Sequence, residues 1–147
     1  MVLMVVRCRL RYGLSLRNLS EMMLARGFEL THEAVRSWEE RYAPLITQHL
    51  RRRPSGRRGK SWYVDEAYIK VKGKWCYLYR AVDRSGRLVD CRLSEHRDMS
   101  AAKQFFKEAL EMSGDAPERV TTDKEVSYPR TIREERGRDL LHRTKQY

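Results

Sequence analysis

Acidic side chains occur at two places where the sequence predicts β-strands, and carboxylates there could bind a metal ion. The stretch 61–71 alternates aromatic or β-branched residues with polar ones, as strands do, and Asp65 and Glu66 lie in its middle. Asp123 directly follows another β-rich run. A carboxylate removed from water is costly unless it is paired or binds a cation. The first stretch alone is equally compatible with an open strand face on which both carboxylates are solvated beside lysines.

The elements that must position these carboxylates form a predicted β-β-β-α-β unit. Its strands are expected at 61–71, 75–82, 87–93 and 117–122, with an amphipathic helix at 100–112 before the last strand. The helix can carry the chain across the sheet, so the fourth strand is expected to pair in parallel with the first. Asp65 and Asp123 would then meet at one site near the strand ends. A charged, helix-like segment at 130–139 and a short strand from Leu140 are expected to follow.

Three short helices are predicted ahead of this body. They cover residues 2–12, 16–26 and 32–43. Gly13 is a helix stop, and Ser15 and Thr31 are suitable N-caps for the second and third helices. Two short helices joined by a Gly-containing turn and preceded by a third form the helix-turn-helix plan.

In that plan the last helix enters the DNA major groove, and its first residues reach the base edges. Thr31, His32 and Arg36 would form the reading group, and the Arg36 guanidinium could bridge O6 and N7 of guanine. The alternative is an ordinary three-helix bundle with a solvated polar face. Glu33 and Glu40 lie on the same face and weigh against DNA reading.

The charge of the chain is strongly positive and unevenly distributed. The 147 residues include 31 Lys and Arg against 20 Asp and Glu, a net charge of +11. The first sixty residues carry 13 basic and 5 acidic side chains, which favours a polyanion-binding head. The Pro-, Ser- and Gly-containing segment 51–60 is expected to be an exposed linker. It is either a solvated hinge or, as we favour after such a head, a contact to DNA phosphates through Arg51, Arg52, Arg53, Arg57, Arg58 and Lys60.

Cysteine usage and hydropathy bear on the environment of the protein. Cys8, Cys76 and Cys91 are odd in number and widely spaced, without a Cys-x-x-Cys motif, so a zinc site is not expected and reducing conditions fit. The apolar run 1–6 is far shorter than the ~20 residues that span a bilayer. We expect a cytoplasmic, nucleoid-associated protein without membrane contact.

Several stretches together resemble the DDE transposases of the insertion-sequence-six family. The resemblance is carried by 11–19 in the head, by Trp38-Glu39-Glu40-Arg41-Tyr42-Ala43-Pro44, and above all by the run from Trp62 to Asp83. It extends along nearly the whole chain. It implies a mixed α/β protein with an α-helical head: a helix-turn-helix unit at 1–50, the basic linker 51–60, and an incomplete ribonuclease-H-like catalytic domain at 61–147.

The resemblance also implies the chemistry. In such enzymes three carboxylates hold two divalent ions, normally Mg²⁺ (or Mn²⁺), and two such ions suit in-line phosphoryl transfer. The family aspartates correspond to Asp65 and Asp123, and Lys124 is expected to contact DNA phosphate. The implied partners are double-stranded DNA, namely terminal inverted repeats and target DNA, and a second copy in a homodimer. Asp83 and Asp90 are expected to be solvated residues outside this site.

One departure from the family pattern matters for activity. The third carboxylate of the family is a Glu that would fall just beyond Tyr147, so we expect a copy truncated before that ligand. Glu134 and Glu135 lie too early in the expected fold to replace it. The sequence therefore predicts either a transposase that cleaves and joins DNA when intact, or an inactive copy that only binds DNA as a repressor.

Overall fold

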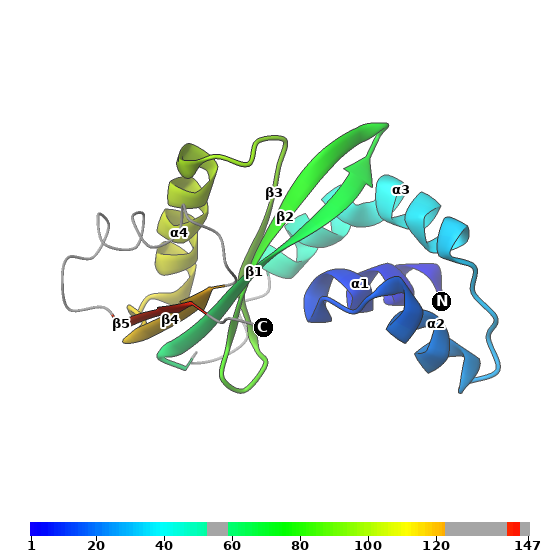
Figure 1. The fold of residues 1–147 in the computed structure, drawn as a ribbon, viewed down its shortest axis with the longest axis horizontal. Helices are drawn as coiled ribbons and strands as arrows, with labels where there is room; N and C mark the ends of the chain where they lie inside the picture. The colour runs from blue at the N-terminus through cyan, green and yellow to red at the C-terminus, as the bar shows by residue number, and fades with distance from the viewer. Residues whose placement is uncertain (53–58, 123–140, 145–147) are drawn as a thin grey trace.

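A computed structural model describes residues 1–52, 59–122 and 141–144 of the chain. Three helices precede a mixed sheet, and a fourth helix connects two of its strands (Figure 1). The elements are α1 (Val2–Tyr12), α2 (Leu16–Leu24), α3 (His32–Arg51), β1 (Ser61–Val71), β2 (Lys74–Asp83), β3 (Leu88–Ser94), α4 (Met99–Ser113), β4 (Arg119–Thr122) and β5 (Leu141–Thr144). The predicted β-β-β-α-β order is confirmed, as is a short strand near residue 141; the helix expected at 130–139 lies outside the described residues.

The helix boundaries follow the predicted caps with two exceptions. Ser15 accepts a hydrogen bond from the Asn18 amide at 3.0 Å, and Thr31 accepts one from the Ala34 amide at 3.2 Å. Gly13 ends α1 with φ 61°, a left-handed conformation that favours glycine. The second helix ends at Leu24, two residues earlier than expected.

The predicted end of the third helix at residue 43 is wrong, because α3 continues through Pro44 to Arg51. Proline removes one helical hydrogen bond and normally ends or bends a helix. Here the residues after it supply an apolar face, with Ile46 and Leu50 buried against the sheet. Burial of that face outweighs the local preference of the proline.

The sheet has the strand order β3-β2-β1-β4-β5. A two-residue turn with Lys72 and Gly73 both at positive φ joins β1 to β2, as expected for a tight hairpin. The fourth strand pairs in parallel with β1, from Ser61 opposite Arg119 to Val64 opposite Thr122. The predicted parallel placement of the first and fourth strands is therefore confirmed.

Two apolar layers hold the sheet, one on each face. The helix α4 covers one face, where Phe105 packs against Trp62 and Tyr79. The opposite face is covered by α1 and α3 of the head, whose buried residues meet Ile69 and Leu78. Figure 1 shows the sheet lying between α4 and the head helices. The head is thus packed directly against the body.

None of the helices described is long and apolar enough to cross a membrane.

Candidate active site on the central strand

Asp65 lies on β1, the central strand of the sheet, and its side chain points to the face that the head covers. Its register partner on β2 is Arg80, and the neighbouring residue on the same face is Ala67. The side chain of Asp65 retains 47% of its accessibility. This strand therefore presents a partly open carboxylate rather than a buried one.

Arg80 occupies both oxygens of this carboxylate. Its Nε lies 3.0 Å from Oδ1 of Asp65, and its Nη2 contacts Oδ2, which makes a bidentate pair. Arg80 itself is buried. The predicted strands 61–71 and 75–82 leave three residues between them, which would place residue 81 opposite residue 65. The structure has a two-residue turn at 72–73 instead, and this turn sets Arg80 opposite Asp65.

The end of α1 fixes the other side of the Arg80 guanidinium. Its Nη1 donates to the Leu10 carbonyl oxygen at 3.4 Å, and a side chain on Gly13 would collide with the guanidinium. The absence of a side chain at Gly13 thus serves two purposes, since this residue also adopts the left-handed conformation that ends α1. Through Arg80, the head contacts the environment of Asp65.

A second ion pair lies beside the first. Arg9 of α1 donates from Nε to Oε1 of Glu39 on α3 at 2.8 Å, and Glu39 is buried. Burial raises the pKa of Glu39, while the nearby Arg9 opposes that rise. Both pairs line one small cavity of about 10 Å³, which is space for roughly one water molecule.

The described residues by themselves do not fit a hydrated divalent ion. They contain no group of three or more His, Cys, Asp or Glu side chains that could hold a metal. Both oxygens of Asp65 accept from Arg80, and the adjacent cavity is too small for an ion with water ligands. Metal binding at Asp65 would require Arg80 to move and further ligands from elsewhere.

Asp123, the predicted second ligand, lies outside the described residues, and so does Lys124. The last described residue of β4 is Thr122, which pairs with Val64. The residues that follow these two in the sequence are Asp123 and Asp65. The assignment of both aspartates to one site stays a prediction.

Asp83 is not the solvated residue that the sequence analysis expected, since it is only 1% exposed. Its carboxylate accepts hydrogen bonds from the backbone amides of Gly59, Ser85 and Arg87 at 2.9–3.0 Å. Burial alone would raise the pKa of Asp83, but these amide donors and the charge of Arg87 lower it. Asp83 organises the turn that follows β2.

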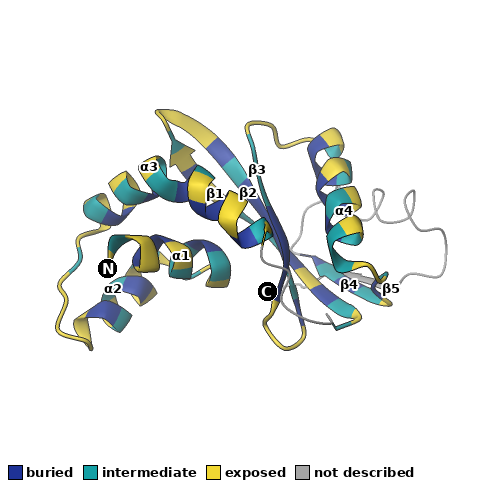
Figure 2. Ribbon diagram, turned by 180° about the vertical axis from the view of Figure 1, so that it is seen from behind, coloured by how far each residue is buried: buried dark blue, intermediate teal, exposed yellow. Residues whose placement is uncertain are grey.

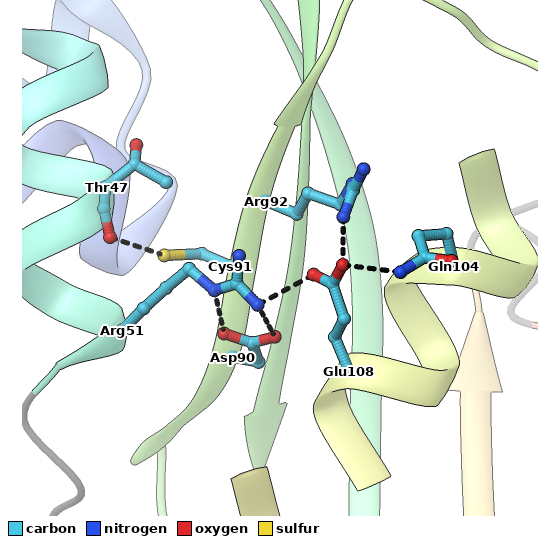
Figure 3. Close-up of polar contacts among 7 residues, drawn as sticks. All are labelled: Thr47, Arg51, Asp90, Cys91, Arg92, Gln104 and Glu108. Atoms are coloured by element: carbon cyan, nitrogen blue, oxygen red, sulfur yellow. Dashed lines mark hydrogen bonds and ion pairs between the residues drawn. The ribbon is translucent and has the colours of Figure 1, made fainter. Parts of the chain in front are cut away.

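Asp90 is likewise buried, which also corrects the expectation of a solvated residue. Arg51, the last residue of α3, pairs with Asp90 at 3.1 Å and with Glu108 of α4 at 2.7 Å (Figure 3). Glu108 in turn accepts from Arg92 and Gln104. Burial raises the pKa of Asp90, against the opposing charge of Arg51. This network ties the head to β3 and α4 along the outer strand of the sheet.

The residues predicted to read DNA lie at the start of α3. His32 and Arg36 are exposed there, and the Thr31 hydroxyl caps the helix. Arg36 lines a hollow of about 720 Å³ between the first half of α3 and the β1–β2 hairpin, along with Lys70 and Trp75. Their role in base reading stays a prediction.

The residues predicted to contact phosphate divide into three groups. Arg51 is engaged in the network described above, whereas Arg52 is exposed. Lys60 is exposed and pairs with Glu118 at 2.6 Å. Arg53, Arg57 and Arg58 lie outside the described residues. A phosphate contact by any of them stays a prediction, and for Arg51 it would compete with two carboxylates.

Comparison with known proteins adds to this geometry. The family model of a DDE domain matches residues 59–146. The chain is 41% identical over 118 residues to the transposase for insertion sequence element IS257 in transposon Tn4003 of Staphylococcus aureus. The same identity relates it to the transposase for insertion sequence-like element IS431mec of Staphylococcus aureus strain Mu50. Each alignment covers 80% of this chain and 52% of the relative, so the chain spans about half the length of these curated relatives.

Among solved structures, the chain is similar to the HTLV-2 integrase catalytic core domain in complex with magnesium, in its trimeric form. The TM-score is 0.51 at 18% sequence identity, over 60% of this chain and 61% of that chain. This likeness shows a ribonuclease-H-like fold, which the family resemblance implied. The family model and the identity to the relatives show that the chain belongs to the DDE transposases of the insertion-sequence-six family.

Proposed function

We propose that this chain acts in DNA transposition, with a head that binds the terminal repeats of a mobile element and a body that carries part of the metal-dependent strand-transfer site. The observation that carries the proposal is the pairing of β1 with β4. It supports a site shared by Asp65 and Asp123, because each follows one member of the Val64–Thr122 pair on adjacent parallel strands.

Divalent ions, Mg²⁺ or Mn²⁺, are the proposed cofactors of that site. The proposal of two ions rests on the family and requires ligands beyond Asp65. It also requires Arg80 to release the carboxylate, since its guanidinium holds both oxygens in this structure. Until then Arg80 neutralises the charge that a metal ion would neutralise.

A second candidate function, DNA binding without cleavage, is favoured by this same contact. Asp65 is paired with a buried arginine, and the cavity beside it has room for roughly one water molecule. A chain with this arrangement could occupy terminal repeats and repress transposition without cutting. Double-stranded DNA is the proposed partner in either case, and a homodimer is the proposed assembly.

One experiment on the full chain distinguishes the two functions. Duplexes selected from a random pool by binding are offered with Mg²⁺ or Mn²⁺, and nicking and binding are measured in parallel. The transposase function predicts metal-dependent nicking that Asp65→Asn abolishes while binding is retained. Binding without nicking in either metal would leave the repressor function, and absence of binding to any duplex would contradict both.

The head assignment has its own test, with Arg52→Ala as the matched control for Arg36→Ala. Losing a base contact by Arg36 should relax the preference at one base pair by about 1–3 kcal/mol. Losing a phosphate contact by Arg52 should weaken binding to all duplexes alike. It should also reduce the slope of log binding constant against log salt concentration by about one. Equal effects of the two substitutions across all sequences would refute Arg36 as a base reader.

A further inference from the structure

Three aromatic side chains lie together on the β1–β2 hairpin, beyond the part of the sheet that α4 covers. Tyr68 and Trp75 stack with ring centroids 4.6 Å apart and planes 8° from parallel. The ring centroid of Tyr77, the register partner of Tyr68, lies 4.9 Å from that of Tyr68. Tyr68 and Trp75 are each 53% exposed. Figure 2 shows the hairpin end as largely exposed ribbon.

Nearer the middle of the sheet, the aromatic residues on the same face are covered by α4. There Tyr79 stacks on Phe105 of α4 and is buried, and the partly buried Tyr77 packs at the edge of that core. The row of aromatic residues thus runs from a filled core onto an open surface. Exposing two large stacked rings has an unfavourable hydration cost, so a ligand that covers them gains free energy from their burial.

Hollows adjoin the exposed rings on two sides. One of about 330 Å³ is lined by Tyr68 and Tyr77 together with Glu66, Ala67 and Arg97, which is near the lower limit for a small-ligand site. Arg97 pairs with Glu66 at 2.8 Å and lies 5.9 Å from the Tyr77 ring centre, so its guanidinium borders the hollow. The larger hollow of about 720 Å³ joins Tyr68 and Trp75 to the start of α3.

Lysines on the hairpin are placed to contact an anionic partner, although Glu33, Glu39 and Glu40 of α3 also line the larger hollow. The hairpin carries Lys70, Lys72 and Lys74, all exposed. The nearby carboxylates of Glu66 and Glu95 are paired with Arg97 and Lys74, the latter at 3.8 Å. Flat, half-exposed rings bordered by cations are how proteins bind unpaired bases, the rings stacking on the bases and the cations contacting the phosphates.

The rings also lie near the proposed cleavage site. Tyr68 is three residues from Asp65 on β1, which corresponds to roughly 10 Å along a strand. The two side chains point to opposite faces of β1. Among the described residues no strand pairs with the edge of β1 beyond Val64 on the side of β4.

We propose that Tyr68, Trp75 and Tyr77, with Lys70 and Arg97 beside them, form a platform on which an unpaired base of a DNA strand stacks. The choice of DNA rests on the proposed function, while the platform itself rests on the hairpin geometry. The ligand class is single-stranded or locally unpaired DNA, recognised by base faces and phosphates without sequence reading.

The test uses a twelve-residue thymidine oligonucleotide and an abasic oligonucleotide of the same length, which carries the same phosphates but no bases. Binding to the full chain and its variants is followed by the anisotropy of a dye-labelled oligonucleotide. Contact with the bases is followed by Trp fluorescence of the unsubstituted chain, since Trp75 is half exposed whereas Trp62 is 1% exposed and Trp38 is partly buried. The thymidine oligonucleotide should bind at least fivefold more tightly than the abasic one and quench the fluorescence. Tyr68→Ala and Trp75→Ala should each weaken its binding by about 5- to 100-fold.

Matched controls keep the test independent of folding and of the proposed function. Tyr63→Ala removes an exposed tyrosine from the opposite face of the same strand and should change the affinity less than twofold, and Tyr68→Phe should bind normally. Both oligonucleotides are offered without divalent metal, so failed metal-dependent nicking leaves this result standing. Equal binding of the two oligonucleotides, equal loss in Tyr63→Ala, or a platform buried by self-association in Trp75-dependent dimers would overturn the proposal.

Discussion

Asp65 and Asp83 lie on the paired strands β1 and β2, yet their carboxylates are bound in opposite ways. Asp83 is buried and accepts three backbone amide hydrogen bonds, which fix the turn after β2. Asp65 is half exposed and held by a single side chain, Arg80. Backbone donors cannot leave without unfolding the turn, whereas a guanidinium can move. The comparison indicates that Asp83 is structural, whereas Asp65 can accept a ligand once Arg80 has moved.

The largest effect expected from this difference is on folding. Asp83→Ala leaves three amide donors without their acceptor, and each buried unsatisfied donor costs about 1–3 kcal/mol. We therefore expect a loss of about 3 kcal/mol in the free energy of unfolding, measured by urea denaturation. Asp83→Asn, which retains one acceptor oxygen, should lose less. A loss below about 0.5 kcal/mol for the alanine variant, the usual range for a surface substitution, would remove the distinction between the two aspartates.

Asp90, like Asp83, is buried and structural, and the substitution Arg51→Ala tests this role by removing the ion-pair partner of Asp90. Removing one partner of a buried ion pair costs about 3–5 kcal/mol, but Arg51 is partly exposed, so we expect about 2 kcal/mol. Arg52→Ala, one residue further along, should cost less than about 0.5 kcal/mol. The two variants are compared by thermal unfolding at equal salt. Equal stabilities would show that the network does not join the head to the sheet.

Asp65→Asn should cost less than either change. Its carboxylate is about half exposed, and the asparagine oxygen still accepts from Arg80, so we expect a loss of about 1 kcal/mol. Urea denaturation in parallel with Asp83→Ala provides the comparison. If Asp65→Asn were the more destabilising of the two, Asp65 would be a structural residue like Asp83.

Acid should have the smallest effect, and it should act through Asp83. The pKa of Asp83 in the folded protein is lowered from its usual value of 3.8, so its contribution to stability is fully present above that value. The contribution is lost as the pH falls below 3.8 through the folded pKa. The difference in unfolding free energy between about pH 6 and pH 3 should therefore shrink in Asp83→Asn, and an unchanged difference would contradict the assignment.

Much of the fold could be predicted because local patterns and tertiary packing agree. The alternation in 61–71, the tight turn at Lys72–Gly73 and the cap at Thr31 all lead to elements that the structure contains. The end of α3 could not be predicted, because Pro44 argues locally for a stop and only the buried face of Ile46 and Leu50 overrides it. The head's docking onto the sheet depends on that same continuation.

The candidate site was predictable in part. The type and position of Asp65 were evident, but Arg80 was not, because the predicted strands 61–71 and 75–82 give a register one residue away from the observed one. The burial of Asp83 and Asp90 was not evident, because a turn or strand pattern in the sequence does not reveal which groups donate hydrogen bonds to a carboxylate. Ser85 and Arg87 are local donors to Asp83, but Gly59 lies 24 positions away from it, and Arg51 lies 39 positions away from Asp90. Only the assembled fold distinguishes a structural aspartate from one that can bind a ligand.

The central claim, that Asp65 and Asp123 share a divalent ion, is tested most directly by Mn²⁺ titration with carboxyl-carbon NMR of the full chain. Paramagnetic broadening should reach the Asp65 and Asp123 signals together and spare Asp83 and Asp90. Asp123→Asn should abolish the broadening at Asp65. Broadening of Asp65 that persists in Asp123→Asn, or its absence in the unsubstituted chain at saturating Mn²⁺, would contradict the claim.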